Sequence, residues 1–287
     1  MRVSIVGAGA IGGALAALLD QAGGHELTLC TRRRLAELTV TWPDGTSRVK
    51  SRIVTAPEIA GAADFVIVAT KTYDAGGAAA WLPSLCADGA PVAIVQNGVE
   101  HRERFLPYVA AERLLPVVID LPVERVGEGD IKVRGATMMK VEDGPLGRDF
   151  AALFSGARAT VELIPDFTTA AWSKLCINSA RVLCALTQKP TSVLWGEAMS
   201  RVALGIVDEC VAVGRAEGAQ LDNGMGERVL AHYRRQAADS VNSLLADRLA
   251  GRRMEIDARN GVIVRKGEKH GIATPLNRMA VALLEAM

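Results

Sequence analysis

Three glycines near the N-terminus constrain the fold more than any other feature of this sequence. They form the pattern Gly7-x-Gly9-x-x-Gly12, which follows an apolar run at 2–6, opens a helical stretch, and is succeeded by a second apolar run at 26–30. In this setting the first glycine permits a tight turn, the second lets a pyrophosphate approach the backbone, and the third allows close packing of strand and helix. The pattern predicts a Rossmann-type dinucleotide site; a glycine turn that binds nothing is the alternative.

Continuous apolar strands mark the rest of the first half. The runs at 65–70 and 92–96 are apolar without alternation and are separated by a helical stretch, which favours a doubly wound parallel sheet covered on both faces. The segments 38–42 and 48–54 are typical of a hairpin. Residues 116–141 are read as two further strands, and we expect them to form an antiparallel extension at the end of the first domain.

Helical periodicity replaces the strand pattern after about residue 165. A last helix is expected to begin at Thr274-Pro275, with Thr as the N-cap and Pro at the first helical position. We therefore predict an α/β protein with an NADP-binding Rossmann domain over 1–164 and an all-helical substrate and catalytic domain over 165–287. The other segments with helical periodicity are 167–186, 192–217 and 226–250.

Composition and charge exclude several classes of protein. The 33 basic residues nearly balance the 32 acidic ones, and a net charge of +1 gives no electrostatic case for nucleic acid or an anionic membrane as partner. No apolar run approaches the roughly 18 residues of a transmembrane helix, and the opening residues lack a secretory signal. The five cysteines are scattered and the four histidines lack ligand spacing. We therefore expect a cytoplasmic protein without a disulfide framework or a metal.

The end of the second strand indicates which dinucleotide binds. An NAD site places a carboxylate there for the ribose 2′-hydroxyl, whereas this chain has Thr31-Arg32-Arg33-Arg34 and no carboxylate before Glu37. A carboxylate would repel a 2′-phosphate, and a guanidinium would bind it. We therefore predict NADPH/NADP as the cofactor, with Arg32 as its principal phosphate contact. Arg33 and Arg34 are equally well explained as a solvated basic turn.

Polar residues also follow two of the predicted parallel strands. Lys71 comes after the run at 65–70, and Gln96-Asn97-Gly98 ends the run at 92–96. Ligands of open α/β sheets gather at the carboxyl ends of the strands, so we expect a site near the nicotinamide. Each residue taken alone is explained as well by an ordinary turn.

Two pairs of residues with i, i+4 spacing stand out in the second half. Lys174 and Asn178 are spaced i, i+4 and so share one face of a helix; a lysine that snorkels to water is the alternative. Glu255 and Arg259 have the same spacing, which would also suit a simple ion pair on a helix.

Taken together, these motifs resemble the ketopantoate reductase (2-dehydropantoate 2-reductase) family. Their order and spacing span nearly the whole chain, so the set is specific although no single motif is. The matching pieces are GAGAIG at 7–12, Lys71, QNGV at 96–99, Lys174-x-x-x-Asn178, Ser243 with Leu244-Leu245-x-Asp247, Glu255-Ile256-Asp257-x-x-Asn260-Gly261, and His270-Gly271 to Asn277.

The resemblance implies a fold, a reaction and a set of roles. It implies a Rossmann domain followed by a helical domain, and NADPH-dependent reduction of a 2-oxo acid, 2-dehydropantoate, to pantoate in pantothenate biosynthesis. Lys174 would be the catalytic acid, and Glu255 would hold the substrate hydroxyl. Substrate contacts would be Asn97, Asn178, Ser243 and Glu255; cofactor contacts would be Gly7, Ala8, Gly9, Ala10, Ile11, Gly12, Arg32, Lys71 and Asn97.

Three positions depart from the family pattern. Val182 stands where a second Asn is common, Ser240 replaces another Asn, and the segment 117–122 is bulkier than expected. Lost polar contacts beside a retained Lys174 leave open a paralogue that reduces another 2-oxo or β-hydroxy acid. A non-catalytic NADPH sensor is the alternative from another class. The sequence does not fix the oligomeric state and leaves a homodimer open.

Overall fold

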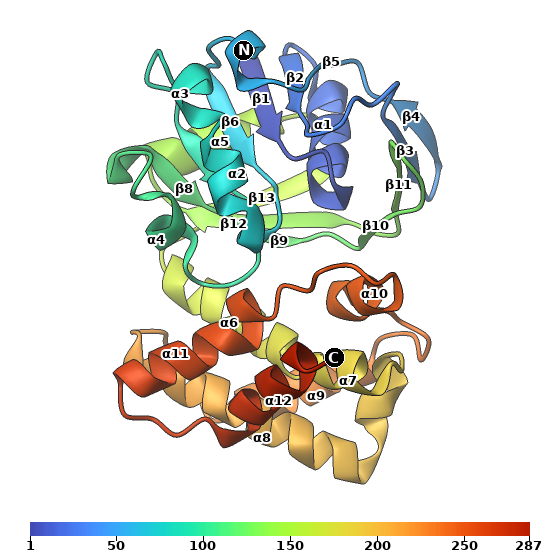
Figure 1. Ribbon diagram of the computed structural model, residues 1–287, viewed down its shortest axis with the longest axis vertical. Helices are drawn as coiled ribbons and strands as arrows, with labels where there is room; N and C mark the ends of the chain where they lie inside the picture. The colour runs from blue at the N-terminus through green and yellow to red at the C-terminus, as the bar shows by residue number, and fades with distance from the viewer. The chain divides into compact units, whose positions relative to one another are not determined.

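The computed structural model describes residues 1–287, and its contacts divide the chain into two compact units. The sheet unit comprises Met1–Gln96 and Glu100–Phe167, and the helical unit comprises Asn97–Val99 and Thr168–Met287. In Figure 1 all strands belong to the blue-to-green part of the chain, whereas the part from yellow to red holds only helices. The predicted fold class, an N-terminal Rossmann-type sheet domain followed by a helical domain, is confirmed.

The main sheet has six parallel strands in the order β5-β2-β1-β6-β7-β8. From β1 the chain builds outward through β2 and β5, then returns to place β6, β7 and β8 on the other side. The order thus reverses between β1 and β6, where ligands of such sheets bind. The bounds are β1 Arg2–Val6, β2 Glu26–Cys30, β5 Arg52–Val54, β6 Phe65–Val68, β7 Val92–Ile94 and β8 Leu114–Pro116.

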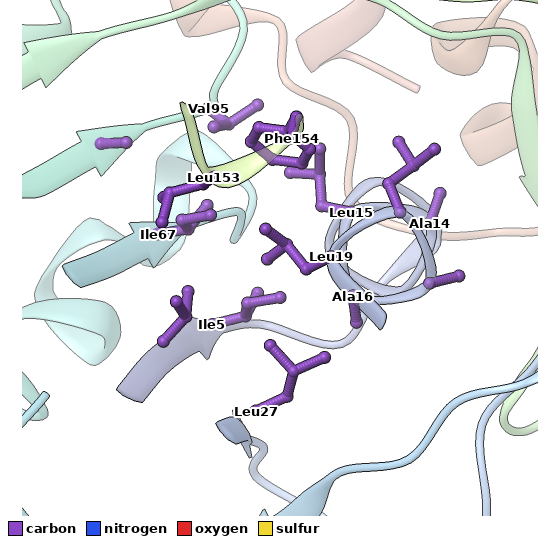
Figure 2. Close-up of a cluster of buried hydrophobic side chains, with 14 of the residues drawn as sticks. Ile5, Ala14, Leu15, Ala16, Leu19, Leu27, Ile67, Val95, Leu153 and Phe154 are labelled. Atoms are coloured by element: carbon purple, nitrogen blue, oxygen red, sulfur yellow. The ribbon is translucent and has the colours of Figure 1, made fainter. Parts of the chain in front are cut away.

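Helix α1 (Ala10–Ala22) covers one face of this sheet because its small and branched apolar residues pack tightly against the strands. Leu15 and Leu19 are fully buried, and Figure 2 shows Leu15 beside Phe154 and Leu19 directed toward Ile5 of β1 and Ile67 of β6. The helix ends at Gly23, whose φ of +74° suits glycine. This packing fixes the N-terminus of α1 at the carboxyl end of β1.

Two smaller sheets complete the unit. Their strand orders are β10-β11-β3-β4 and β13-β12-β9. The segment 116–141, read as two strands, holds four, β9 to β12. β10 and β11 pair antiparallel as expected, but the extension is mixed because β3–β11 and β12–β13 pair in parallel. The bounds are β3 Thr39–Trp42, β4 Gly45–Arg48, β9 Val118–Asp120, β10 Val123–Arg125, β11 Asp130–Val133, β12 Thr137–Glu142 and β13 Ala159–Ile164.

The predicted hairpin at 38–42 and 48–54 is right in its first strand and wrong in its second. β3 pairs antiparallel with Gly45–Arg48, and Arg52–Val54 joins the parallel sheet as β5. The turn takes only two residues between Trp42 and Gly45, so the return strand begins earlier than expected. The short helices of the unit are η1 Pro57–Ile59, η2 Thr72–Asp74, α2 Ala75–Ala79, α3 Leu82–Leu85, α4 His101–Phe105, η3 Ala111–Arg113 and α5 Pro145–Leu153.

The helical unit surrounds its own apolar core. Two expected long helices are interrupted: 167–186 is divided into α6 and α7, and 226–250 into α9 and α10. No helix of the chain is both long enough and apolar enough to cross a membrane. The bounds are α6 Phe167–Ser179, α7 Val182–Thr187, η4 Thr191–Trp195, α8 Glu197–Ala216, α9 Met225–Arg234, α10 Ser243–Leu249, η5 Asp257–Gly261, α11 Val262–Lys269 and α12 Pro275–Glu285.

Helix α12 begins at Pro275, as the sequence predicts, but it is capped differently. Thr274 occupies the N-cap position without making a side-chain cap hydrogen bond. The carboxylate of Glu209, on α8, instead accepts from the N–H groups of Leu276 at 2.8 Å and Asn277 at 2.9 Å. A carboxylate at this end also favours the positive pole of the helix dipole.

Candidate functional site

The glycine turn has the shape that a pyrophosphate needs. Gly7 adopts a φ of +102°, and a Cβ on Gly12 would lie 1.9 Å from the carbonyl oxygen of Gly7, so neither position accepts a side chain. A Cβ on Gly9, the N-cap of α1, would meet nothing within 4 Å. The first-turn N–H groups of α1 have no acceptor within the helix. Residues 7–12 therefore fit a dinucleotide phosphate.

Arg32 lies at the carboxyl end of β2, in a turn that Thr31 fixes. The Thr31 hydroxyl donates to the carbonyl of Arg33 at 2.7 Å, and the Arg32 side chain is 81% exposed. Its Nη1 is 3.5 Å from Oδ2 of Asp74 in η2. Sequence reasoning missed this carboxylate because it comes from the segment after β6 rather than from β2.

Gln96 connects the ends of β6 and β7. It is buried, and its amide Nε2 donates to the carbonyl and hydroxyl oxygens of Thr70, both at 3.1 Å. His101 Nε2 lies 2.9 Å from the Gln96 carbonyl. Burial lowers the pKa of His101 to about 4, so the ring is neutral and donates from Nε2. Lys71 follows the carboxyl end of β6, is half-buried and occupies the N-cap position of η2.

Lys174, in the helical unit, has a pKa well below that of an ordinary lysine. It lies on α6, one turn before the buried Asn178, and the Tyr233 hydroxyl fixes that turn by donating to the Ile177 carbonyl. Burial, and then the positive charges of Arg181 and Arg259, lower the pKa of Lys174 to about 7. Such an ammonium gives up and regains a proton near neutral pH, as a general acid requires.

Glu255 and Asn97 are in direct contact within the helical unit. The Asn97 amide donates to Oε2 of Glu255 at 3.0 Å, although 158 residues separate them. Glu255 is only 4% exposed. Glu255 precedes the helix there, which begins at Asp257 and is a π-helix, and its negative charge acts on Arg259. The contact gives the buried Glu255 carboxylate an amide donor from a distant part of the chain.

Ser243 begins α10, and its neighbour Asn242 caps that helix. The Asn242 Oδ1 accepts from the N–H groups of Leu244 and Leu245 at 3.0 and 3.1 Å. The exposed Ser243 hydroxyl accepts from Nη2 of Arg259 at 2.7 Å. Arg259 was not among the predicted site residues. It stands four residues after Glu255 and is plainly a charged residue, but nothing in the sequence indicates that it is buried.

Family models account for both halves of the chain. A model described as Ketopantoate reductase PanE/ApbA matches residues 3–145, and its C-terminal counterpart matches residues 166–287. The 2-dehydropantoate 2-reductase of Caulobacter vibrioides is 47% identical over 284 residues, covering 99% of this chain and 98% of that protein. The chain belongs to the ketopantoate reductase family. It is accordingly an oxidoreductase that acts on a keto group.

Other members of the family extend the match to solved structures. The 2-dehydropantoate 2-reductase of Mycobacterium tuberculosis is 39% identical, covering 99% of this chain and 97% of that protein. The ketopantoate reductase of Ralstonia eutropha JMP134 superposes with a TM-score of 0.91 at 32% identity, over 100% of this chain and 98% of that one. A dimeric ketopantoate reductase from Staphylococcus aureus has a TM-score of 0.87 at 20% identity, over 100% and 98%, and so shares the fold.

The departures from the family pattern have local structural settings. Val182 is fully buried in the apolar core of the helical unit, which explains an apolar side chain there. The backbone carbonyl of Ser240 accepts from both the N–H and the hydroxyl of Thr191, at 2.9 Å each. Neither setting requires Asn, so the family's fold is retained without the two amides.

Proposed function

We propose that this chain reduces the keto group of a 2-oxo acid with NADPH, and that its substrate is 2-dehydropantoate. The observation that carries the proposal is Lys174, half-buried in the same unit as the buried Glu255 and with its pKa lowered to about 7. A proton donor and a carboxylate that accepts from an alcohol are what the reduction of a hydroxylated 2-oxo acid needs.

Lys174 would act on the carbonyl oxygen of the substrate. A bound reduced nicotinamide supplies the hydride, and the carbonyl oxygen gains negative charge as the hydride arrives. The ammonium of Lys174 stabilises that charge and then gives a proton to the oxygen, leaving a neutral amine. The alcohol product is released, and the amine takes a proton from solvent.

Glu255 would select for a substrate with a hydroxyl. Its carboxylate already accepts from Asn97 and, being buried, loses free energy if a substrate without a hydroxyl leaves it underpaired. Asn97, Asn178 and Ser243 would supply neutral donors to the substrate. These roles carry over from the family resemblance and agree with the location of all four residues in the helical unit.

On the cofactor side we propose NADPH, held by residues 7–12 and by Arg32. Lys71 and Asn97 would contact its nicotinamide end. Arg32→Ala should weaken NADPH binding by about 1.5–3 kcal/mol and NADH binding much less, because only NADPH carries the 2′-phosphate. Isothermal titration of both cofactors measures this, with Arg34→Ala as an exposed control from the same turn. Equal losses for the two cofactors would contradict the assignment.

A substrate panel tests the reaction. We expect NADPH oxidation with 2-dehydropantoate to exceed that with pyruvate, 2-oxobutyrate, 2-oxoisovalerate and 3,3-dimethyl-2-oxobutanoate; the last lacks only the hydroxyl. Glu255→Gln should reduce that final preference. NADPH binding with turnover of a different acid would reassign the chain to a paralogue, and binding with no turnover at all would favour a sensor.

The same preparation tests assembly. We propose a homodimer, as reported for the Staphylococcus aureus protein. Light scattering on a size-exclusion column should then give about twice the chain mass of 30.4 kDa. A single-chain mass at micromolar concentration would refute the dimer and leave the reaction untouched.

A further inference from the structure

Arg259 is a buried cation whose hydrogen-bonding capacity is largely unused. Its side chain is 2% exposed, and its Nη2 donates to Ser243 at 2.7 Å. Its Nε and Nη1 are buried and have no hydrogen-bond partner in the protein. A guanidinium carries five N–H groups, and leaving those of two nitrogens unsatisfied in the interior is costly. Such an arrangement indicates that an acceptor binds there.

The backbone that carries Arg259 is held firmly in place. Arg259 lies in the π-helix η5, a geometry frequent at functional sites. Its neighbour Asn260 donates from Nδ2 to the Ser179 carbonyl at 3.1 Å and to Oδ1 of Asn277 at 2.8 Å. Asn260 and Asn277 are both fully buried. The unusual helix therefore presents the Arg259 side chain from a rigid support.

The charges around Arg259 favour an anion. Arg181, between α6 and α7, places a further positive charge near Arg259. Its guanidinium lies over the Tyr233 ring, and its buried Nε has no hydrogen-bond partner in the protein. Two carboxylates oppose these cations. Asp247 already accepts from Arg252 at 2.9 Å, and Glu255 accepts from Asn97. With Lys174 also within range of Arg259, the cluster holds more cations than these two carboxylates balance.

We propose that Arg259 and Ser243 form the subsite for the substrate's carboxylate. Because the Ser243 oxygen accepts from Arg259, its own O–H is left to donate outward from an exposed position. A carboxylate bound there receives this O–H and lies against the guanidinium, which supplies the missing counter-charge. A guanidinium binds a carboxylate through either of two edges, one formed by Nε and Nη2 and the other by Nη1 and Nη2. Each edge includes one of the nitrogens that have no partner in the protein.

The proposed subsite compensates for the two amide contacts that the departures from the family pattern remove. Val182 and Ser240 stand where other members have amides, and a charged donor from η5 offers a stronger contact to an acid than an amide does. The inference rests on the proposed function, since it names the group that holds one end of that substrate. It predicts a strict requirement for a carboxylate.

A pair of matched ligands tests the subsite. Pantoate and its uncharged primary amide are titrated calorimetrically into enzyme saturated with NADP⁺, and the corresponding 2-oxo acid and 2-oxo amide are compared in turnover. Arg259→Met should weaken the acid about 10- to 100-fold and the amide far less, with KM rising more than kcat falls. Arg259→Lys should fall between, because it keeps the charge and loses the fork. In the Arg259→Met background, Ser243→Ala should have little further effect.

Controls separate this inference from a structural role and from the proposed function. Arg265→Met, on α11 and paired with Asp257, should leave the ratio of acid to amide binding unchanged. Arg259→Met should unfold at a Tm no lower than the wild type, because it removes an unsatisfied buried charge. Equal losses for acid and amide would overturn the subsite while leaving the reductase intact. A wild type that binds pantoate through Arg259 but reduces no 2-oxo acid would overturn the reaction alone.

Discussion

At the scale of single residues, the acid role proposed for Lys174 gives a prediction about pH, because its lowered pKa fixes where the proton donor is lost. With a pKa near 7, the free enzyme loses its acid above neutrality. We therefore expect kcat/KM for reduction to be level below pH 7 and to fall about tenfold per pH unit above it, whereas kcat/KM for oxidation of the 2-hydroxy acid should rise and level off. A bound carboxylate favours the ammonium, so the corresponding fall in kcat should come at higher pH.

A pH–rate profile between pH 5.5 and 9.5 in both directions measures this. Lys174→Ala should lower kcat by about 10²–10⁴ while NADPH still binds. Lys174→Arg, which stays charged throughout, should lose the fall near pH 7 along with most of its activity. Profiles for reduction and oxidation that run parallel would contradict the assignment, because a single acid–base group must act in opposite senses in the two directions.

The same scale shows what a sequence reveals of a site. Lys174 with Asn178 and the glycines of 7–12 were predictable because local spacing alone places them on one helix face or in one turn. The contact of Asn97 with Glu255 spans 158 residues, and no local pattern encodes it. The sequence shows that Arg259 is charged but not that it is buried, because its burial depends on the tertiary packing around η5.

At the scale of helices and strands, one acid on α8 and one at its C-cap hold the ends of two neighbouring helices. Glu209 caps α12, and Glu217 at the end of α8 binds the last turn of α11 through Lys266 at 2.6 Å, Lys269 at 2.9 Å and His270 at 2.5 Å. The start of α12 was predictable from Pro275, whereas its capping group was not, because it comes from a distant helix. The interrupted helices were missed for a similar reason: tertiary packing overrides periodicity.

Glu217 therefore gives a prediction about how the helical unit is held together. Burial would raise the pKa of Glu217, but the hydrogen bonds from Lys266, Lys269 and His270 outweigh it and lower the pKa from the usual 4.5 to about 2. A carboxylate with a depressed folded pKa adds stability that is present above pH 4.5 and is lost as the pH falls toward 2. Glu217→Gln should lower the free energy of unfolding by about 2 kcal/mol at pH 7.

Chemical denaturation at pH 7, 4.5 and 3 measures this effect. The difference between wild type and Glu217→Gln should shrink as the pH falls below 4.5, because the unfolded chain takes up a proton at Glu217 there while the folded chain keeps this carboxylate charged down to about pH 2. Glu285→Gln, an exposed acid at the end of α12, serves as the matched control and should change stability little at any of these pH values. A Glu217→Gln effect that is the same at pH 3 as at pH 7 would mean that the ion pairs do not form in solution.

At the scale of the whole molecule, chemistry and stability are divided between the two units. The predicted phosphate contacts belong to the sheet unit, and the proposed proton donor Lys174, Glu255 and Arg259 belong to the helical unit. The sheet unit has no buried charge at its glycine turn, since the predicted phosphate ligands there are backbone N–H groups. The helical unit instead contains the half-buried Lys174 and the buried Arg259, and both have a lowered pKa because desolvation disfavours their charged forms. Its function therefore costs it stability.

That cost has a definite dependence on pH. Between about pH 7 and 10.5 the unfolded chain keeps the Lys174 proton while the folded chain has released it, so the unfolded state binds more protons and stability rises with pH. Below pH 7 both states are protonated, and the full penalty, about 3–5 kcal/mol for this shift, is present. Lys174→Met removes the penalty, so it should be more stable than the wild type at pH 6, with an advantage that falls by about 2–3 kcal/mol from pH 7 to 9.

Denaturant unfolding of the helical unit, followed through the buried Trp172 on α6, measures this difference at each pH. Taking the difference between the two proteins cancels the other titrating groups, which they share. A stability advantage that stays constant from pH 6 to 9 would show that Lys174 titrates at its ordinary value, and the neutral-pH acid proposed for the reaction would fall with it. An advantage that declines as described would instead show that one lowered pKa has two effects. It makes Lys174 a proton donor near neutral pH, and it makes the burial of its charge cost stability.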